Sequence, residues 1–252
     1  MKESAPPTLP GGYALVSAWL SLQPPPPPPA TTVHGGRAGW SCETRRVSAL
    51  EHLWPALLAD HTRLRDRLLE AYAEPHRGYH DTRHLAEVLT HLERLLERHE
   101  LSEDTRTAVV LAAWFHDAIH DGDRDDEERS AALAESLLAA SDVPQPLVAE
   151  VARLVRLTAE HRPADGDVGG QLLCDADLAI LASGEQRYDE YVRDVRGEYA
   201  HLDDATFRAG REKILRALLD KPTLFHTDDA RAQWEEPARA NLARELSAPG
   251  SA

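Results

Sequence analysis

Residues 108–115 have the sequence AVVLAAWF, and His116 and Asp117 follow directly. Eight successive apolar residues leave no polar face if they are helical, and a helix that is apolar all round lies at the centre of its bundle. The segment therefore predicts a buried central helix over about residues 104–120. We expect the other elements of the chain to be helices that cover it.

The sequence on both sides carries the three- and four-residue spacing of apolar side chains that is typical of amphipathic helices. A long helix is expected over 81–99, after shorter helical segments before residue 73. Further helices are expected over 126–140, 145–160, 171–183, 185–201, 204–219 and 229–247. No segment alternates apolar and polar residues as a half-buried strand would, and no internal repeat is present. The sequence predicts a single all-α helical bundle domain over residues 46–247.

The two ends of the chain differ from this pattern. Residues 1–45 are rich in Pro and Gly and include six consecutive prolines at 24–29. Such a run forms a polyproline II rod that joins neither a helix nor a sheet. We expect a disordered leader over 1–45 and a disordered tail over 248–252.

Composition excludes several classes of protein. The 252 residues carry a formal net charge of −15, which disfavours nucleic acid polymers as partners because duplex binding needs a basic face. Cys42 and Cys174 are the only cysteines, too few for a disulfide framework, and this fits a reducing cytoplasm. The sequence contains no run of about twenty apolar residues, so no membrane-spanning helix is expected. A small anionic ligand stays compatible if a metal or a local basic group supplies positive charge, and the oligomeric state is not predicted.

Histidine and aspartate side chains occur where apolar residues are expected. His80 and His84 are four residues apart, so they share one face of a helix. The pair His116–Asp117 ends the most apolar run in the chain, where burial of polar groups costs free energy unless something compensates. A divalent cation is one compensation, and a hydrogen-bonded core histidine is the simpler alternative.

A second carboxylate pair, Asp175 and Asp177, heads the apolar segment LAIL at 178–181. An Asp at the start of a helix is commonly an N-cap, which is the structural alternative for Asp175. Core helices that each bring a His or an Asp to one buried point are, however, how metal sites are built in helical bundles. Together these positions predict a divalent metal site, with either carboxylate as a ligand.

Three motifs in order give a resemblance to a known family: YHDTRH at 79–84, WFHDAIH at 114–120 and DADLAIL at 175–181. They resemble the HD superfamily of metal-dependent phosphohydrolases, whose signature is His, His-Asp and Asp. The chain is most similar to the bacterial group of predicted HD phosphohydrolases. Its further marks are PHRGYHDTRH at 75–84, DEERSA at 126–131, TAEH at 158–161 and EYAHLDDATFRAGR at 198–211. The resemblance covers roughly residues 47–247 and implies an HD-type helical bundle.

The resemblance also implies a ligand set. It makes His84 the first ligand, His116 and Asp117 the central pair, and Asp177 rather than Asp175 the last ligand. Two imidazoles and two carboxylates suit Mn²⁺, Fe²⁺, Co²⁺, Ni²⁺, Zn²⁺ or Mg²⁺.

Other roles follow from proximity to these ligands. Asp117 or Asp175 would accept the proton in metal-assisted hydrolysis, and His80 would orient water or phosphate. His161 and Glu127 are expected in the outer shell or at a second metal, although a His at a helix C-terminus is also favoured by the helix dipole. His120 is expected just outside the site.

Substrate contacts are expected in the loop before the first ligand. Arg77 is the stronger candidate to hold phosphate and Arg83 the weaker, and surface ion pairing is the alternative for both. Tyr79 is expected to stack on the substrate or to hydrogen-bond with it. The function implied is hydrolysis of a small phosphate ester, with a nucleotide suggested only by analogy. Non-phosphate chemistry such as oxygenation or hydration, a nucleotide-sensing protein without turnover, and a purely structural helical protein are the alternatives.

Overall fold

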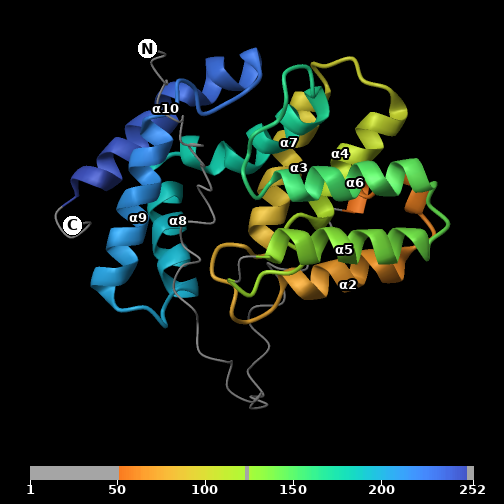
Figure 1. Ribbon diagram of the computed structural model, residues 1–252, viewed down its shortest axis with the longest axis horizontal. Helices are drawn as coiled ribbons and strands as arrows, with labels where there is room; N and C mark the ends of the chain where they lie inside the picture. Colours follow the sequence, from red (N-terminus) through yellow and green to blue (C-terminus); the bar gives the residue numbers. More distant parts are fainter. Residues whose placement is uncertain (1–50, 123–124, 249–252) are drawn as a thin grey trace, which may run out of the picture.

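The structure is a computed structural model that describes residues 51–122 and 125–248 (Figure 1). All regular elements in these two ranges are helical, which confirms the predicted all-α class. The expected leader over 1–45, and all but the first residue of the expected tail, lie outside the described residues.

The helices follow the predicted order along the chain. Two 3₁₀ turns, η2 (Glu51–Leu53) and η3 (Ala56–Leu58), come first. The longer elements are α2 (Thr62–Tyr72), α3 (Thr82–Leu96), α4 (Glu103–Phe115), α5 (Asp126–Ala139), α6 (Gln145–Leu157), α7 (Val168–Asp177), the 3₁₀ helix η4 (Leu178–Ala182), α8 (Glu185–Glu198), α9 (Asp204–Leu219) and α10 (Asp228–Ser247).

Helix α4 occupies the centre of the first group of helices, as its apolar sequence predicts. It contacts α3, α5, α6 and α7, and seven of its residues from Ala108 to Phe115 are buried. Figure 1 shows α8, α9 and α10 together on one side of the molecule, with α2, α5 and α6 on the other. The 3₁₀ helix η4 contacts α3, α7, α8 and α10, so it lies where the two groups meet.

Helix α7 begins earlier than predicted, at Val168 instead of residue 171. The predicted turn at 164–170 contains Gly169 and Gly170, which are helix breakers in sequence but lie inside α7 here. A Cβ atom on Gly169 would lie 2.9 Å from Cγ2 of Val109 in α4. One on Gly170 would lie 2.4 Å from Oδ2 of Asp167, the N-cap of α7, and 2.6 Å from Cδ2 of Leu157 in α6. These glycines therefore serve the close approach of α7 to its neighbours, an interhelical contact that a local pattern cannot reveal.

In the described part of the chain, none of the helices combines the length and the apolar character that crossing a membrane would require.

Substitution of Gly169 tests the close packing of α7 on α4. Gly169→Ala should lower the free energy of unfolding by about 1–3 kcal/mol, because the added methyl group overpacks the contact with Val109. Gly210→Ala is the matched control: Gly210 lies within α9 and its Cβ would meet no atom within 4 Å. That control should raise stability by up to about 1 kcal/mol through helix propensity. Thermal or urea unfolding measures both, and equal effects of the two variants would contradict the packing argument.

Candidate metal centre

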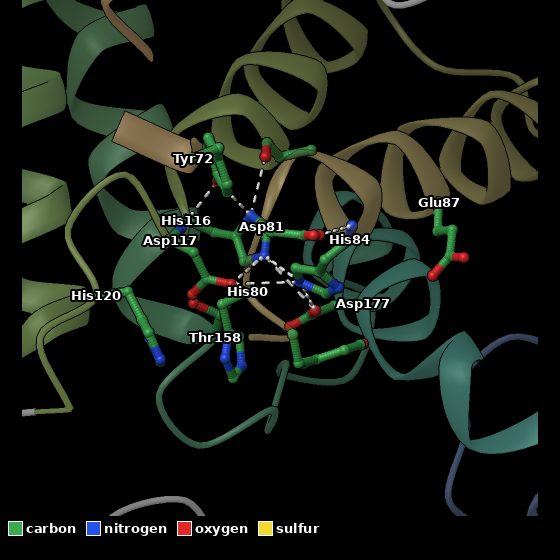
Figure 2. Close-up of polar contacts among 12 residues, drawn as sticks. Tyr72, His80, Asp81, His84, Glu87, His116, Asp117, His120, Thr158 and Asp177 are labelled. Carbon is green, nitrogen blue, oxygen red and sulfur yellow. Dashed lines mark hydrogen bonds and ion pairs between the residues drawn. The ribbon is translucent and has the colours of Figure 1, made fainter. Parts of the chain in front are cut away.

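One end of each of three helices lies at the same buried point: the start of α3 and the last residues of α4 and α7. At the start of α3, the N-cap Asp81 accepts hydrogen bonds from the backbone N–H groups of Arg83 and His84, which places His84 in the first turn. At the end of α4, His116 and Asp117 follow the last helical residue. Asp177 is the last residue of α7. Figure 2 shows these side chains pointing toward one another.

The donor atoms of these four side chains lie close together. Nε2 of His84 is 3.1 Å from Nε2 of His116. Oδ2 of Asp117 lies 3.3 Å and 3.0 Å from these two nitrogens, and Oδ1 of Asp177 lies 3.3 Å and 3.6 Å from them. Two ligands at about 2.1 Å from one ion and at near-right angles would be about 3.0 Å apart. The separations therefore fit a divalent cation shared by His84, His116 and Asp177, and Asp117 contacts both imidazoles beside them.

The chemistry of the donors fits a cation as well. Nδ1 of His116 lies 2.9 Å from the carbonyl oxygen of Ala113, an atom that can only accept a hydrogen bond. A neutral His116 ring therefore carries its proton on Nδ1 and turns the lone pair of Nε2 toward His84. The Nε2 atom of His84 can donate to that lone pair as a neutral ring. If His84 carries its proton on Nδ1 instead, both Nε2 lone pairs face the same point, and a cation there would be bound by both.

The electrostatics of the group favour positive charge at the same point. Burial lowers the pKa of His84, but its hydrogen bonds with Asp117 and Asp177 outweigh burial, so that pKa is raised. Burial is likewise outweighed at His116, where the charge of Asp117 helps to hold the pKa well above its usual value. Burial raises the pKa of both carboxyls, yet the imidazoles, His116 first, hold it well below the usual range. The carboxylates are thus ionised and attract either protons or a metal ion.

Asp175 faces away from this point, which corrects its predicted catalytic role. Its side chain is completely buried and accepts hydrogen bonds from the backbone N–H of His226, at 2.7 Å, and of Thr227, at 2.8 Å. The Thr227 hydroxyl donates a third bond at 2.7 Å. Burial raises the pKa of Asp175 despite these bonds. Asp175 therefore anchors the start of α10. It is not an N-cap of its own helix either, since it lies near the C-terminal end of α7.

Arg77 does not reach the cavity, which corrects the prediction that it holds phosphate. Its side chain is inaccessible to solvent. Nη1 donates to the carbonyl oxygens of Asp117, at 2.6 Å, and His80, at 3.1 Å, while Nη2 donates to that of Ala118, at 3.2 Å. A salt bridge with Glu74 uses Nε at 3.2 Å. Arg77 therefore fastens the loop before α3 to the segment that carries the His-Asp pair.

The other two expected substrate contacts also have structural partners. Arg83 pairs with Glu87, at 3.0 Å, and Glu190, at 2.8 Å, which matches the surface alternative. The ring of Tyr79 packs against His84, with centroids 4.7 Å apart, and lines a cavity at the site. Its hydroxyl is buried with no hydrogen-bond partner among the described residues. The ring can contact a ligand there, but the hydroxyl is not presented to solvent.

His161 and Glu127 lie around the four central side chains. Nε2 of His161 is 2.7 Å from Oδ2 of Asp177, so it orients the carboxylate whose other oxygen faces the histidines. Glu127 lines the cavity, and burial together with the nearby charge of Asp117 raises its pKa, despite an opposing backbone hydrogen bond. A carboxyl in this state can hold a proton closer to neutral pH than an exposed one.

A second group, which the sequence did not predict as a group, consists of His80, His120 and Glu198. Nδ1 of His80 lies 2.8 Å from Oε2 of Glu198, and Nε2 of His120 lies 3.7 Å from the same oxygen. Burial raises the pKa of Glu198, but the two imidazoles outweigh it and lower the pKa strongly. His120 lines the cavity, which corrects its expected position outside the site. In the sequence Glu198 stands out only as the first residue of the motif at 198–211, because no local spacing links α8 to the loop before α3.

The cavity at the site has a volume of about 180 Å³. Asp117, Asp177 and Glu127 line its polar part, and its apolar wall consists of Leu178, Ile180, Leu181, Val195, Ile214 and Leu218. Two cationic residues line it. Arg211 is paired with Glu245, at 2.7 Å, whereas the half-buried Lys221 makes no side-chain hydrogen bond or ion pair among the described residues. The sequence marks Lys221 only through Pro222, which follows it and is typical of a helix end.

Comparison of the chain with protein-family models, curated proteins and solved structures gives no match.

The two carboxylates of α7 provide a matched test of the site. Asp177→Asn should weaken Mn²⁺ or Zn²⁺ binding at least about tenfold, because a neutral amide is a poorer ligand than a carboxylate. Asp175→Asn should leave that affinity near the parent value and lower the free energy of unfolding by about 1–3 kcal/mol. The reason is that an N–H₂ group, which can only donate, would replace one of the two oxygens that accept from the backbone N–H groups of His226 and Thr227. Calorimetric titration and urea unfolding measure the two effects. An exchange of the two phenotypes would show that the ligand is Asp175.

Proposed function

We propose that the protein is a metal-dependent phosphoric ester hydrolase of the HD type that acts on a small phosphate ester. The observation that carries this proposal is the convergence of His84, His116, Asp117 and Asp177, of which the two carboxylates line a cavity. The order of these residues along the chain, His, His-Asp and Asp, is the signature of the family that the sequence resembles.

These four residues would hold the cation, which supplies Lewis acidity for a phosphoryl oxygen and lowers the pKa of a water nucleophile. His161 keeps the Asp177 carboxylate oriented through the 2.7 Å contact at Oδ2. Asp117 lines the cavity and would accept the proton of the attacking water, which the bound cation makes more acidic. Glu127 lines the same cavity with a raised pKa and donates a proton to the departing oxygen.

Lys221 favours an anionic substrate over neutral chemistry such as oxygenation or hydration. It is a half-buried cation in a protein with a net charge of −15, and none of the described carboxylates pairs with it. An ammonium left in this state attracts a phosphate or a second anionic group of the substrate. The cavity volume of about 180 Å³ is below the roughly 300–1,000 Å³ of sites for drug-sized ligands, which favours a compact ester over a full nucleotide.

Catalysis is tested by removal of the central carboxylate. Asp117→Ala should lower metal-dependent phosphate release at least about a hundredfold, because Lewis-acid stabilisation is worth several kcal/mol and each 1.4 kcal/mol is tenfold in rate. The assay is phosphate release from a panel of small esters, with each divalent ion added back. Circular dichroism should still show the helical spectrum. Unchanged turnover in this variant would place the chemistry elsewhere.

Lys221→Met tests the anionic substrate separately from the metal. The loss of a charge-assisted contact should raise KM or lower kcat/KM by a factor of roughly ten to a hundred, and metal content should not change. Lys213→Met is the control, since Lys213 is exposed on α9 and does not line the cavity. Equal kinetics for Lys221→Met and the parent on every ester would remove Lys221 from substrate binding.

A further inference from the structure

The group of His80, His120 and Glu198 has the composition of a second cation site. Its three donors come from three separate segments: the loop before α3, the loop after α4 and the last residue of α8. Oε2 of Glu198 lies 2.8 Å from Nδ1 of His80 and 3.7 Å from Nε2 of His120, and the two rings are 4.0 Å apart between centroids. Ligands of one ion at about 2.1 Å, with angles of about 90–109°, are roughly 3.0–3.4 Å apart. The observed separations lie on both sides of that range, so small side-chain adjustments bring the donors into place.

Glu198 is held so that one oxygen is available to a ligand. Its Oε1 accepts hydrogen bonds from three successive backbone N–H groups, of Gly78 at 3.0 Å, Tyr79 at 2.8 Å and His80 at 2.9 Å. Its side chain is 5% exposed. The loop can lie this close to α8 because Gly78 has no side chain: a Cβ there would be 2.4 Å from the carbonyl oxygen of Asp194. Oε1 is therefore committed to the backbone, and Oε2 alone faces the two imidazoles.

The second group lies beside the first. His80 and His120 line the same cavity as Asp117 and Asp177, and the ring centroids of His80 and His84 are 5.5 Å apart. Asp117 contacts the first pair of histidines through Oδ2, and Oδ1 makes no hydrogen bond or ion pair among the described residues. Figure 2 shows His120 on the side of Asp117 that faces away from His84. The Asp117 carboxylate is thus placed to face both groups.

We propose that His80, His120 and Glu198 bind a second divalent cation, next to the site formed by His84, His116, Asp117 and Asp177. Binding of this ion does not depend on the proposed hydrolysis, but its role rests on that function. There it would add positive charge on the second side of a bound phosphate, as in two-ion phosphoryl-transfer sites.

The test is the number of ions bound by the full chain. The parent protein, loaded with Mn²⁺ and freed of excess ion, should hold two ions per chain by elemental analysis and give the electron paramagnetic resonance spectrum of a coupled pair. His120→Ala should hold one ion and give a single-ion spectrum. Glu198→Gln should behave in the same way, because an amide oxygen can still accept from the backbone while the anionic ligand is lost. His201→Ala, which removes an exposed histidine three residues after Glu198, should keep two.

The outcomes separate the second site from the proposed hydrolysis. A parent that binds one ion, or variants of His120 and Glu198 that still bind two, would overturn the second site. Phosphate release by a one-ion protein would overturn the second site and leave the hydrolase proposal in place. Two bound ions with no phosphate release from any ester would support the second site and overturn the hydrolase proposal.

Discussion

The mutual attraction of two buried imidazoles and two buried carboxylates constrains most of this fold. The side chains of His84 and His116 are almost completely buried. Those of Asp177 and Asp117 are only 13% and 15% exposed, so none of the four is well hydrated. Removing such groups from water is costly unless opposite charges or a metal replace the hydration. All four must therefore reach the same point. This requires that α3 begin, and α4 and α7 end, within a few ångströms of one another, and the apolar faces of these helices pack accordingly.

Two charged side chains, Arg77 and Glu198, hold the loops around that point. The Arg77 guanidinium binds carbonyl oxygens on both sides of the site, and Oε1 of Glu198 binds three N–H groups of the loop before α3. Arg77 thus donates hydrogen bonds to carbonyl oxygens of non-helical backbone, and Glu198 accepts them from N–H groups of non-helical backbone. Buried backbone groups need such partners, since they otherwise lose the hydrogen bonds they would make with water. The loops are consequently fixed by side chains from distant parts of the sequence.

The helices and the central donors could be predicted from the sequence, whereas the functions of the surrounding residues could not. The apolar run before His116 has a local signature, and the ordered motifs single out Asp177, although the helix predicted over 171–183 ends at Asp177 and continues as the 3₁₀ helix η4. Arg77 and Arg83 both lie close to His84 in the sequence, but the direction of the Arg77 side chain depends on which carbonyl groups the fold brings beside it. Glu198 and Lys221 enter the site from α8 and from the turn after α9, through packing that no local period encodes. Proximity in sequence is therefore a poor guide to which side chains face a cavity.

Asp175 and Asp177 are two residues apart in α7, so they point to nearly opposite sides of the helix. One binds the backbone where α10 begins, and the other faces the candidate metal centre. A rotation of this last turn of α7 about the helix axis would displace both carboxylates together, in opposite directions because they lie on opposite sides. The final turn of α7 therefore couples the position of the start of α10 to the position of the Asp177 carboxylate at the candidate metal centre.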